Sequence, residues 1–483
     1  MMRTAFRSAN DLAGMIRRRE IGAVELLELY LERIDTLDSS INAVIWQDRE
    51  GALETARAAD ARTVAGGDLP PLHGVPMTIK ESFDIAGAPT TWGDPAFRDN
   101  IARHDCVAVE RLKVAGVTLF GKTNVPLNLA DWQSFNDIYG ITSNPWDTER
   151  TPGGSSGGSA AALAAGLTGI ETGSDIGASI RNPAHYCGVF GHKPSFGICP
   201  PRGQALPGIL TGPDMAVIGP LARSAGDLEI ALNAMAGPDT LDAAGWRLEL
   251  PAPHARSLGD LRVAVMLESG LSEVDGAYLD MLQDLVDGIA RKGATVSDAA
   301  RPDVDLRDVH EIYIQMLRAA TSARLPQTKL EEFQAARARL DPGDTSYLAL
   351  MTRGNTMAHR EWMALNERRE HIRWAWRHFF EDWDVLVSPA AASTAFPHDH
   401  AGERHDRTIR VNGHEVPTTD QMFWAGFGLM ALLPGTVAPA GISRDGLPGG
   451  IQITGPWLGD LTTIQVAHLI EREFGGFQPP PGL

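Results

Sequence analysis

The most informative stretch of the chain is Thr151-Pro-Gly-Gly-Ser-Ser-Gly-Gly-Ser159. Its four glycines and three serines exclude a regular helix or strand, and glycine lets the backbone adopt positive φ and approach other groups closely. The alanine-rich run 160–166 that follows predicts a tightly buried helix beginning at this loop. Free N–H groups at such a helix start can bind an anion or an oxyanion. We therefore interpret the stretch as the backbone of a functional site.

Two other interpretations of this stretch are less favoured. A nucleotide phosphate loop requires Gly-Lys followed by Ser or Thr, whereas Gly158 is followed by Ser159 and Ala160. A flexible Gly/Ser linker is inconsistent with the apolar sequence that lies close on both sides.

Two further clusters carry residues suited to nucleophilic chemistry. In Gly173-Ser-Asp-Ile-Gly-Ala-Ser179, the last serine has small neighbours, which a nucleophile needs so that its oxygen is exposed and backbone N–H groups reach the oxyanion. A lone serine there is usually a turn or cap residue, but the nearby glycine/serine loop favours a shared site. The run Gly74-Val-Pro-Met-Thr-Ile-Lys80 resembles a buried strand that ends in a lysine. Such a lysine would be desolvated, and its pKa would fall.

These three pieces, in this order, resemble the amidase signature family, and the resemblance extends along nearly the whole chain. Segments 121–126, 143–146, 219–220 and 449–455 are also similar to family segments, and 182–187 is similar to a bacterial branch. The resemblance implies an α/β fold, the amidase signature fold, in which α-helices cover both faces of a large mixed, twisted β-sheet.

The family pattern implies a role for each matching residue. Ser179 would be the nucleophile, Ser155 a bridging serine after a cis peptide bond from Gly154, and Lys80 the base. The oxyanion would bind backbone N–H groups of the segment from Ile176 through Gly177 and Ala178 to Ser179. Three residues would support this loop: Ser174, Asp175 and Arg181. Two would lie beside the acyl group of the substrate, which would be apolar or aromatic: Leu129 and Trp132.

Position 178 departs from the family pattern. The family usually has glycine immediately before the nucleophile, and this chain has Ala178. Alanine still supplies an N–H group, but it is strained if the position requires positive φ.

A lysine base must be uncharged to accept a proton. Holding a lysine neutral at pH 7 costs about 4.6 kcal/mol at its reference pKa, and burial can supply much of that shift. Ser155 would then pass a proton from Ser179 to Lys80 and later to the leaving amine, with an acyl-enzyme between the two steps. The mechanism requires no cofactor and no metal.

Several other side chains suggest different chemistry. Cys187 is a rival nucleophile, but its apolar surroundings are typical of an inert buried thiol. Four side chains in a short segment could form a metal site, although prolines and charges nearby favour a solvated loop: His398, Asp399, His400 and His405. Trp92 and Trp424, like Trp132, are candidates for a substrate pocket, although tryptophans are more often part of the core.

The 483 residues contain no convincing linker or repeat, and we interpret 1–483 as a single domain. It would comprise N-terminal helices (1–60), a signature core (61–240), a helical elaboration (241–377) and a return to the core (378–483). Helical spacing of Val24, Leu27, Leu31 and Ile34 supports the first assignment.

Composition limits the partners and the compartment. The net charge of −18 disfavours nucleic acid or an anionic membrane as partner, because both require basic patches. Three cysteines do not make a disulfide framework, and no apolar stretch approaches the length of a membrane span, so we expect a cytoplasmic protein. Its partner would be a small-molecule amide, and similarity to the family suggests a homodimer.

Three functions remain open from the sequence. The favoured one is a hydrolase of amides or esters. The first alternative is the amidotransferase subunit of a tRNA-dependent glutamyl- or aspartyl-tRNA amidotransferase, although Trp374-Ala-Trp-Arg-His-Phe-Phe380 does not resemble that subunit. The second is a non-catalytic binding protein with the same fold, which the intact triad disfavours.

Overall fold

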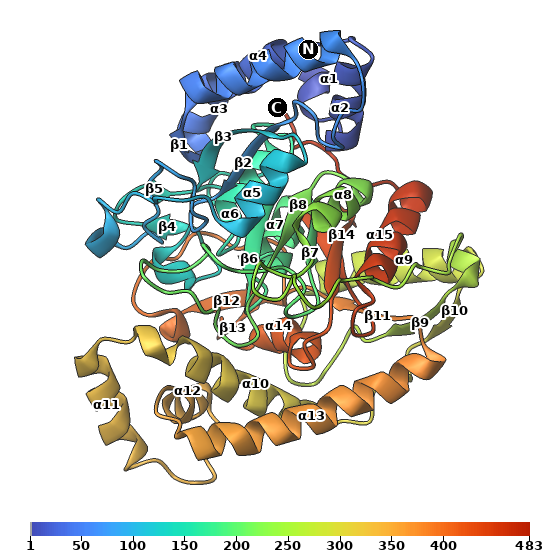
Figure 1. Ribbon diagram of the computed structural model, residues 1–483. Coiled ribbons are helices and arrows are strands. Elements are labelled where there is room, and N and C mark those ends of the chain that lie inside the picture. The colour runs from blue at the N-terminus through green and yellow to red at the C-terminus, as the bar shows by residue number, and fades with distance from the viewer. Residues whose placement is uncertain (1) are drawn as a thin grey trace.

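A computed structural model describes residues 2–483 and contains an eight-stranded mixed β-sheet at its centre (Figure 1). The strand order is β10-β9-β11-β15-β14-β7-β8-β6. The pairs β10–β9 and β9–β11 are parallel, and the other neighbours are antiparallel. A second sheet has the order β1-β3-β2, and two hairpins, β4-β5 and β12-β13, complete the strands. The strands are β1 Val44–Gln47, β2 Pro76–Lys80, β3 Thr118–Thr123, β4 Phe135–Asn136, β5 Gly140–Ile141, β6 Glu171–Asp175, β7 Phe190–Lys193, β8 Val217–Ala222, β9 Arg262–Val265, β10 Thr295–Ser297, β11 Val385–Pro389, β12 Thr408–Val411, β13 His414–Pro417, β14 Gly435–Ile442 and β15 Pro448–Thr454.

Fifteen α-helices surround these strands in the described residues. The predicted N-terminal helix is α3, which ends where Asn42 adopts a left-handed conformation, and the predicted alanine-rich helix is the fully buried α6. The helices are α1 Met2–Ala5, α2 Ala9–Arg17, α3 Ala23–Ile41, α4 Arg49–Ala65, α5 Val107–Val114, α6 Gly157–Ala164, α7 Arg181–Cys187, α8 Ala225–Met235, α9 Gly276–Arg291, α10 Leu306–Thr321, α11 Gln327–Arg337, α12 Tyr347–Asn355, α13 His359–Asp382, α14 Met422–Leu429 and α15 Asp460–Phe474. Short 3₁₀ turns lie at Pro95–Phe97, Leu127–Leu129, Leu258–Asp260, Ser322–Arg324 and Arg404–Asp406.

Helices cover both faces of the large sheet, as strand β14 shows. Neighbouring residues of a strand point to opposite faces. Val437 packs in an apolar cluster with Ile180 and Ala184 beside α7, whereas the hydroxyl of Thr436 donates a hydrogen bond to Thr463 of α15, at 2.8 Å. The two helices therefore lie on opposite faces, and the expected α/β architecture is confirmed.

The two sheets meet where the candidate site lies. An isolated parallel bridge joins Met77 of β2 to Ile170, immediately before β6. Parallel strands end at the same edge, so Lys80 at the end of β2 lies beside Ser174 and Asp175 at the end of β6. The loop that leads into α6 reaches the same edge.

The middle third adds a helical layer on one side of the core (Figure 1). Helix α10 packs against α12, α13 and α14 and brings this layer toward the loops that follow β6. The predicted boundary at residue 377 falls inside α13, which continues to Asp382. Among residues 2–483, no helix is long and apolar enough to cross a membrane.

Candidate active site

Lys80 lies at the centre of a cluster of serine hydroxyls. Its side chain is 0% exposed, and Nζ lies 2.7 Å from Oγ of Ser155 and 3.0 Å from Oγ of both Ser156 and Ser174. No carboxylate of the described residues forms an ion pair with it. Burial lowers the pKa of Lys80 to about 7, against the opposing charges of Asp175, Glu171 and Glu81. A large fraction of this amine is therefore uncharged near neutral pH.

The glycine/serine loop holds Ser155 against the lysine. The peptide bond between Gly154 and Ser155 is cis, and α6 begins two residues later. Glycine is required at 158 because a Cβ there would overlap the backbone of Asn124. The loop therefore packs directly on a neighbouring segment of the core.

Ser155 and Ser179 open into the same cavity, which has a volume of about 290 Å³. The backbone N–H of Ser156 donates to the carbonyl of Ser179 at 3.1 Å, which joins the two loops. Within the described residues, no hydrogen bond connects the hydroxyls of Ser155 and Ser179. The structure thus brings together all three residues of the expected triad and forms the Lys80–Ser155 contact directly.

The loop before Ser179 presents backbone donors to the cavity. Among the described residues, none accepts a hydrogen bond from the N–H groups of Ile176, Gly177 or Ser179. The N–H of Ala178 differs, because it donates to Oδ1 of Asp175 at 2.9 Å. Among the described residues, the N–H of Ala178 is therefore the one of these four that already has an acceptor, and its predicted part in the oxyanion site stays a prediction.

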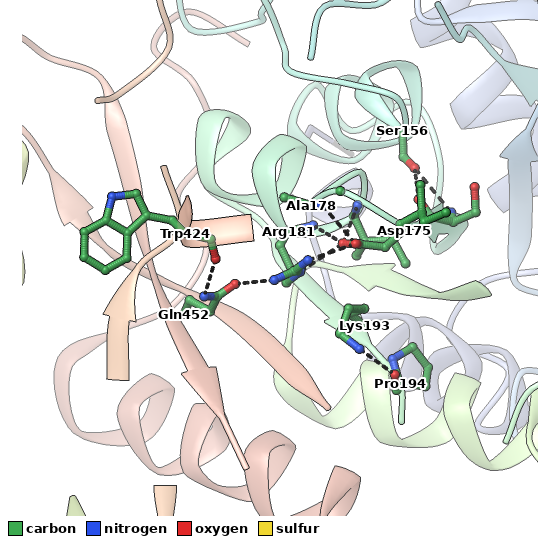
Figure 2. Close-up of polar contacts among 12 residues, drawn as sticks. Ser156, Asp175, Ala178, Arg181, Lys193, Pro194, Trp424 and Gln452 are labelled. Atoms are coloured by element: carbon green, nitrogen blue, oxygen red, sulfur yellow. Dashed lines mark hydrogen bonds and ion pairs between the residues drawn. The ribbon is translucent and has the colours of Figure 1, made fainter. Parts of the chain in front are cut away.

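Asp175 and Arg181 connect this loop to the central strand β15 of the large sheet (Figure 2). Both side chains are buried, and the guanidinium of Arg181 donates to both carboxylate oxygens of Asp175 at 2.9 and 3.0 Å. Burial by itself would raise the pKa of Asp175, but the charge and hydrogen bonds of Arg181 hold that pKa below its usual range. Arg181 also donates to Gln452 of β15 at 2.7 Å. The expected supporting residues thus fix the loop, and Gln452 is a member that the sequence motifs did not assign.

Ala178 occupies a backbone conformation that favours glycine. Its φ is +67°, and its side chain is fully buried. We expect Ala178→Gly to change the free energy of unfolding by about 1 kcal/mol or less, because relief of left-handed strain is offset by backbone entropy and the lost methyl group. We expect Ala178→Val to lower it by about 3 kcal/mol, since a branched side chain adds overpacking to the strain. Urea unfolding of both variants measures these changes. Equal free energies of unfolding for Ala178→Gly and Ala178→Val would contradict the strain at position 178.

The rival nucleophile and the nearby histidines lie outside the cavity. Cys187 is buried, its thiol donates to the carbonyl of Pro152, and burial raises the pKa of that thiol. His185 is also buried, which lowers its pKa to about 4, and it contacts the backbone of Ser393 and Gly450. His73 bonds to Thr63, remote from the serines. None of the three lines the cavity.

The histidine-rich segment does not converge on a metal site. The rings of His398 and His400 lie 5.2 Å apart, and His400 stacks on Phe135. In the part of the chain that the structure describes, no group of three or more His, Cys, Asp or Glu side chains is placed to hold a metal ion.

Most of the residues predicted to face the substrate line the cavity, and one of the tryptophans does not. Leu129 and Trp132 both line the cavity, and Nε1 of Trp132 donates to the carbonyl of Gly177 at 2.7 Å. Trp92 lines it as well, whereas Trp424 is a core residue whose carbonyl accepts from Gln452.

Sequence reasoning missed several residues that complete the site. Ser156 adds a third hydroxyl to Lys80, and Gln204 donates to Ser174 at 3.3 Å. Ser156 belongs to the glycine/serine loop, so its position was a usable signal. One part of the cavity wall carries no motif. The helical layer supplies Leu317, Arg318, Thr321, Arg324, Leu325 and Pro326, and the C-terminal region supplies Arg404 and Met422.

Comparison with known proteins shows which family the whole chain resembles. A family model described as Amidase matches residues 25–464. The chain is 34% identical to the indoleacetamide hydrolase of Bradyrhizobium diazoefficiens, over 97% of this chain and 86% of the relative. It is 33% identical to a glutamyl-tRNA(Gln) amidotransferase subunit from Acidothermus cellulolyticus, over 97% and 94% of the two chains. Among solved structures, it superposes on a chain from an inhibitor-bound vestigial protein complex, described as revealing the evolutionary origins of an s-triazine catabolic enzyme. The TM-score is 0.81 and the sequence identity is 28%, over 98% of this chain and 99% of that chain.

Proposed function

Because this chain belongs to the amidase signature family, we propose that it hydrolyses carboxylic amides through Ser179, Ser155 and Lys80. The observation that carries the proposal is the buried amine of Lys80, 2.7 Å from the hydroxyl of Ser155, in a cavity that Ser179 also lines. A serine hydroxyl needs a base, and this amine is the titratable group placed to act on the pair.

The proposed reaction begins with a proton transfer along the three side chains. Uncharged Lys80 accepts a proton from Ser155, and Ser155 accepts one from Ser179 as Oγ of Ser179 attacks the amide carbon. This step requires the Ser179 hydroxyl to turn toward Ser155 when substrate binds, since catalytic hydrogen bonds often tighten only then. The N–H groups of Ile176, Gly177 and Ser179 stabilise the oxyanion.

Collapse of the tetrahedral intermediate completes the first half of the reaction. The C–N bond breaks, Ser155 donates its proton to the leaving nitrogen, and Lys80 returns a proton to Ser155. The acyl group stays on Ser179 as an ester. A water molecule then loses its proton along the same chain and attacks the ester, which releases the acid and restores the three side chains.

The protonation of Lys80 makes a specific pH dependence the expected result. The pKa of Lys80 is about 7 and only its neutral form accepts a proton, so kcat/KM should rise about tenfold per unit below pH 7 and level off above it. Lys193 serves as the matched control. It is buried with a pKa also lowered to about 7 by burial, but among the described residues its Nζ donates a hydrogen bond only to the carbonyl of Pro194 (Figure 2) and to no serine. Lys193→Met should keep the midpoint. A flat wild-type profile between about pH 5.5 and 8.5 would contradict the assignment.

The similarity to an amidotransferase subunit supports a second candidate function. That relative matches nearly the whole chain at an identity close to that of the indoleacetamide hydrolase. In this second function, the same triad would release ammonia from an amide donor for transfer to an aminoacyl-tRNA, with partner subunits.

Purification of the chain alone separates the two functions. We expect the isolated protein to release acid and ammonia or amine from members of a panel of aliphatic, aryl and cyclic amides. The apolar wall formed by Trp92, Leu129 and Trp132, with its two indole rings, favours aryl or arylacetyl amides within that panel. Activity that appears only with glutamine, a charged tRNA and co-purifying subunits would replace the proposed hydrolase with the amidotransferase.

A further inference from the structure

Three arginines that form no ion pair with a carboxylate in residues 2–483 line the cavity that contains Ser179. Arg318 and Arg404 both donate to the hydroxyl of Tyr347, which is not a carboxylate, and Arg404 also contacts the sulfur of Met422. The guanidinium of Arg324 lies 4.4 Å from the ring centre of Trp92, and no described residue accepts a hydrogen bond from it. The Nε–H of Arg318 is buried and also has no acceptor among the described residues.

The well-buried arginines among the described residues are satisfied in one of two ways. Arg33 and Arg223 donate to backbone carbonyls, and the other three form ion pairs. Arg181, Arg369 and Arg407 each lie within 2.9 Å of an aspartate oxygen. The carboxylates that line the cavity are already occupied in this way, since Asp175 pairs with Arg181 and Asp131 with Arg407. The cavity lining therefore has an excess of positive charge, and it offers N–H donors of Arg318 and Arg324 that have no acceptor in the part of the chain that the structure describes.

We propose that the substrate is an amide that carries a carboxylate, and that Arg318, Arg324 and Arg404 bind this carboxylate. The inference rests on the proposed function and deepens it by naming the substrate class. A guanidinium offers forked N–H donors that match the two oxygens of a carboxylate, and such charge-assisted bonds are about twice as strong as neutral ones. The half-buried position of the three arginines strengthens the attraction relative to bulk water.

The carboxylate can lie on either side of the scissile bond, and two substrate pairs distinguish the sides. Succinamate and neutral succinamide, compared by ammonia release, place the charge on the acyl part. N-acetylglycine and neutral N-acetylglycinamide, compared by acetate release, place it on the amine part. We expect kcat/KM of the charged member to exceed that of its neutral partner about tenfold or more in one pair, from one or two charge-assisted bonds.

Variants assign the preference to the arginines. Arg318→Gln and Arg324→Gln should each lower kcat/KM for the charged member about tenfold more than for the neutral one, mainly through KM. Arg339→Gln is the matched control, because Arg339 is exposed in the same helical layer and its Nε bonds to the carbonyl of Ala335, away from the cavity. This control should leave both substrates unchanged.

Binding to an inactive protein tests the inference without turnover. Calorimetric titration of Ser179→Ala with the two pairs should show tighter binding of a charged member, and Arg318→Gln in that background should remove the difference. Equal binding of charged and neutral members in both pairs would overturn the carboxylate proposal while leaving amide hydrolysis intact. A charged preference in binding, with no hydrolysis of any amide by wild-type protein, would instead overturn the proposed function and retain the anion site.

Discussion

Replacing Ser179 with alanine is expected to lower kcat for amide hydrolysis by about four orders of magnitude or more. The substitution removes the oxygen that forms the acyl bond, and the remaining oxyanion donors and lysine can act only on water. Steady-state kinetics with the best amide of the panel measures the effect. The variant should fold normally, since the described hydrogen bonds of Ser179 involve its backbone and not its hydroxyl.

Cys187→Ala is the matched control for this experiment. It removes the rival nucleophile, which is buried and does not line the cavity, and it should retain kcat within about twofold. Near wild-type turnover by Ser179→Ala, or loss of turnover in Cys187→Ala with the fold intact, would assign the nucleophile to a different residue.

Lys80→Ala is expected to lower kcat by about three orders of magnitude. The substitution removes the base and the group that orders three hydroxyls, those of Ser155, Ser156 and Ser174. The residual rate of Lys80→Ala should no longer rise with pH near 7, whereas we predict such a rise for the wild-type enzyme. The pH profile therefore distinguishes loss of a base from a general weakening of the site.

The control for this prediction is again Lys193→Met. Both lysines are buried with pKa values lowered to about 7, so the two variants remove the same kind of group from similar surroundings. If Lys193→Met lost as much activity as Lys80→Ala while circular dichroism remained unchanged, the base would not be Lys80.

Short-range features of the fold were predictable from the sequence. The glycine/serine loop and the alanine run specify a buried helix start, and β2 was visible as an apolar run that ends in Lys80. Motif order supplied the family and, through it, the mixed sheet. The predicted boundary between the helical elaboration and the return to the core, at residue 377, lies inside α13, because a polar amphipathic helix has no sharp compositional boundary in this region.

The site was predictable only where its residues lie in motifs. Arg181 was named, but its partner Gln452 lies 271 positions away, and only the packing of β15 beside α7 brings them together. The hydrogen bond from the N–H of Ala178 to Asp175 was not predictable, because a sequence does not reveal where the Asp175 carboxylate points. Arg318 and Arg404 meet at Tyr347 through helix packing that leaves no local pattern.

The central claim is that Lys80, through Ser155, activates Ser179, and covalent labelling tests it most directly. Intact protein is treated with a fluorophosphonate across the pH range, and tandem mass spectrometry locates the label. We expect a single label on Ser179, formed faster as the pH rises through about 7 and strongly slowed in Lys80→Ala. A label on another residue, or a rate of labelling at Ser179 that is independent of Lys80, would contradict the account.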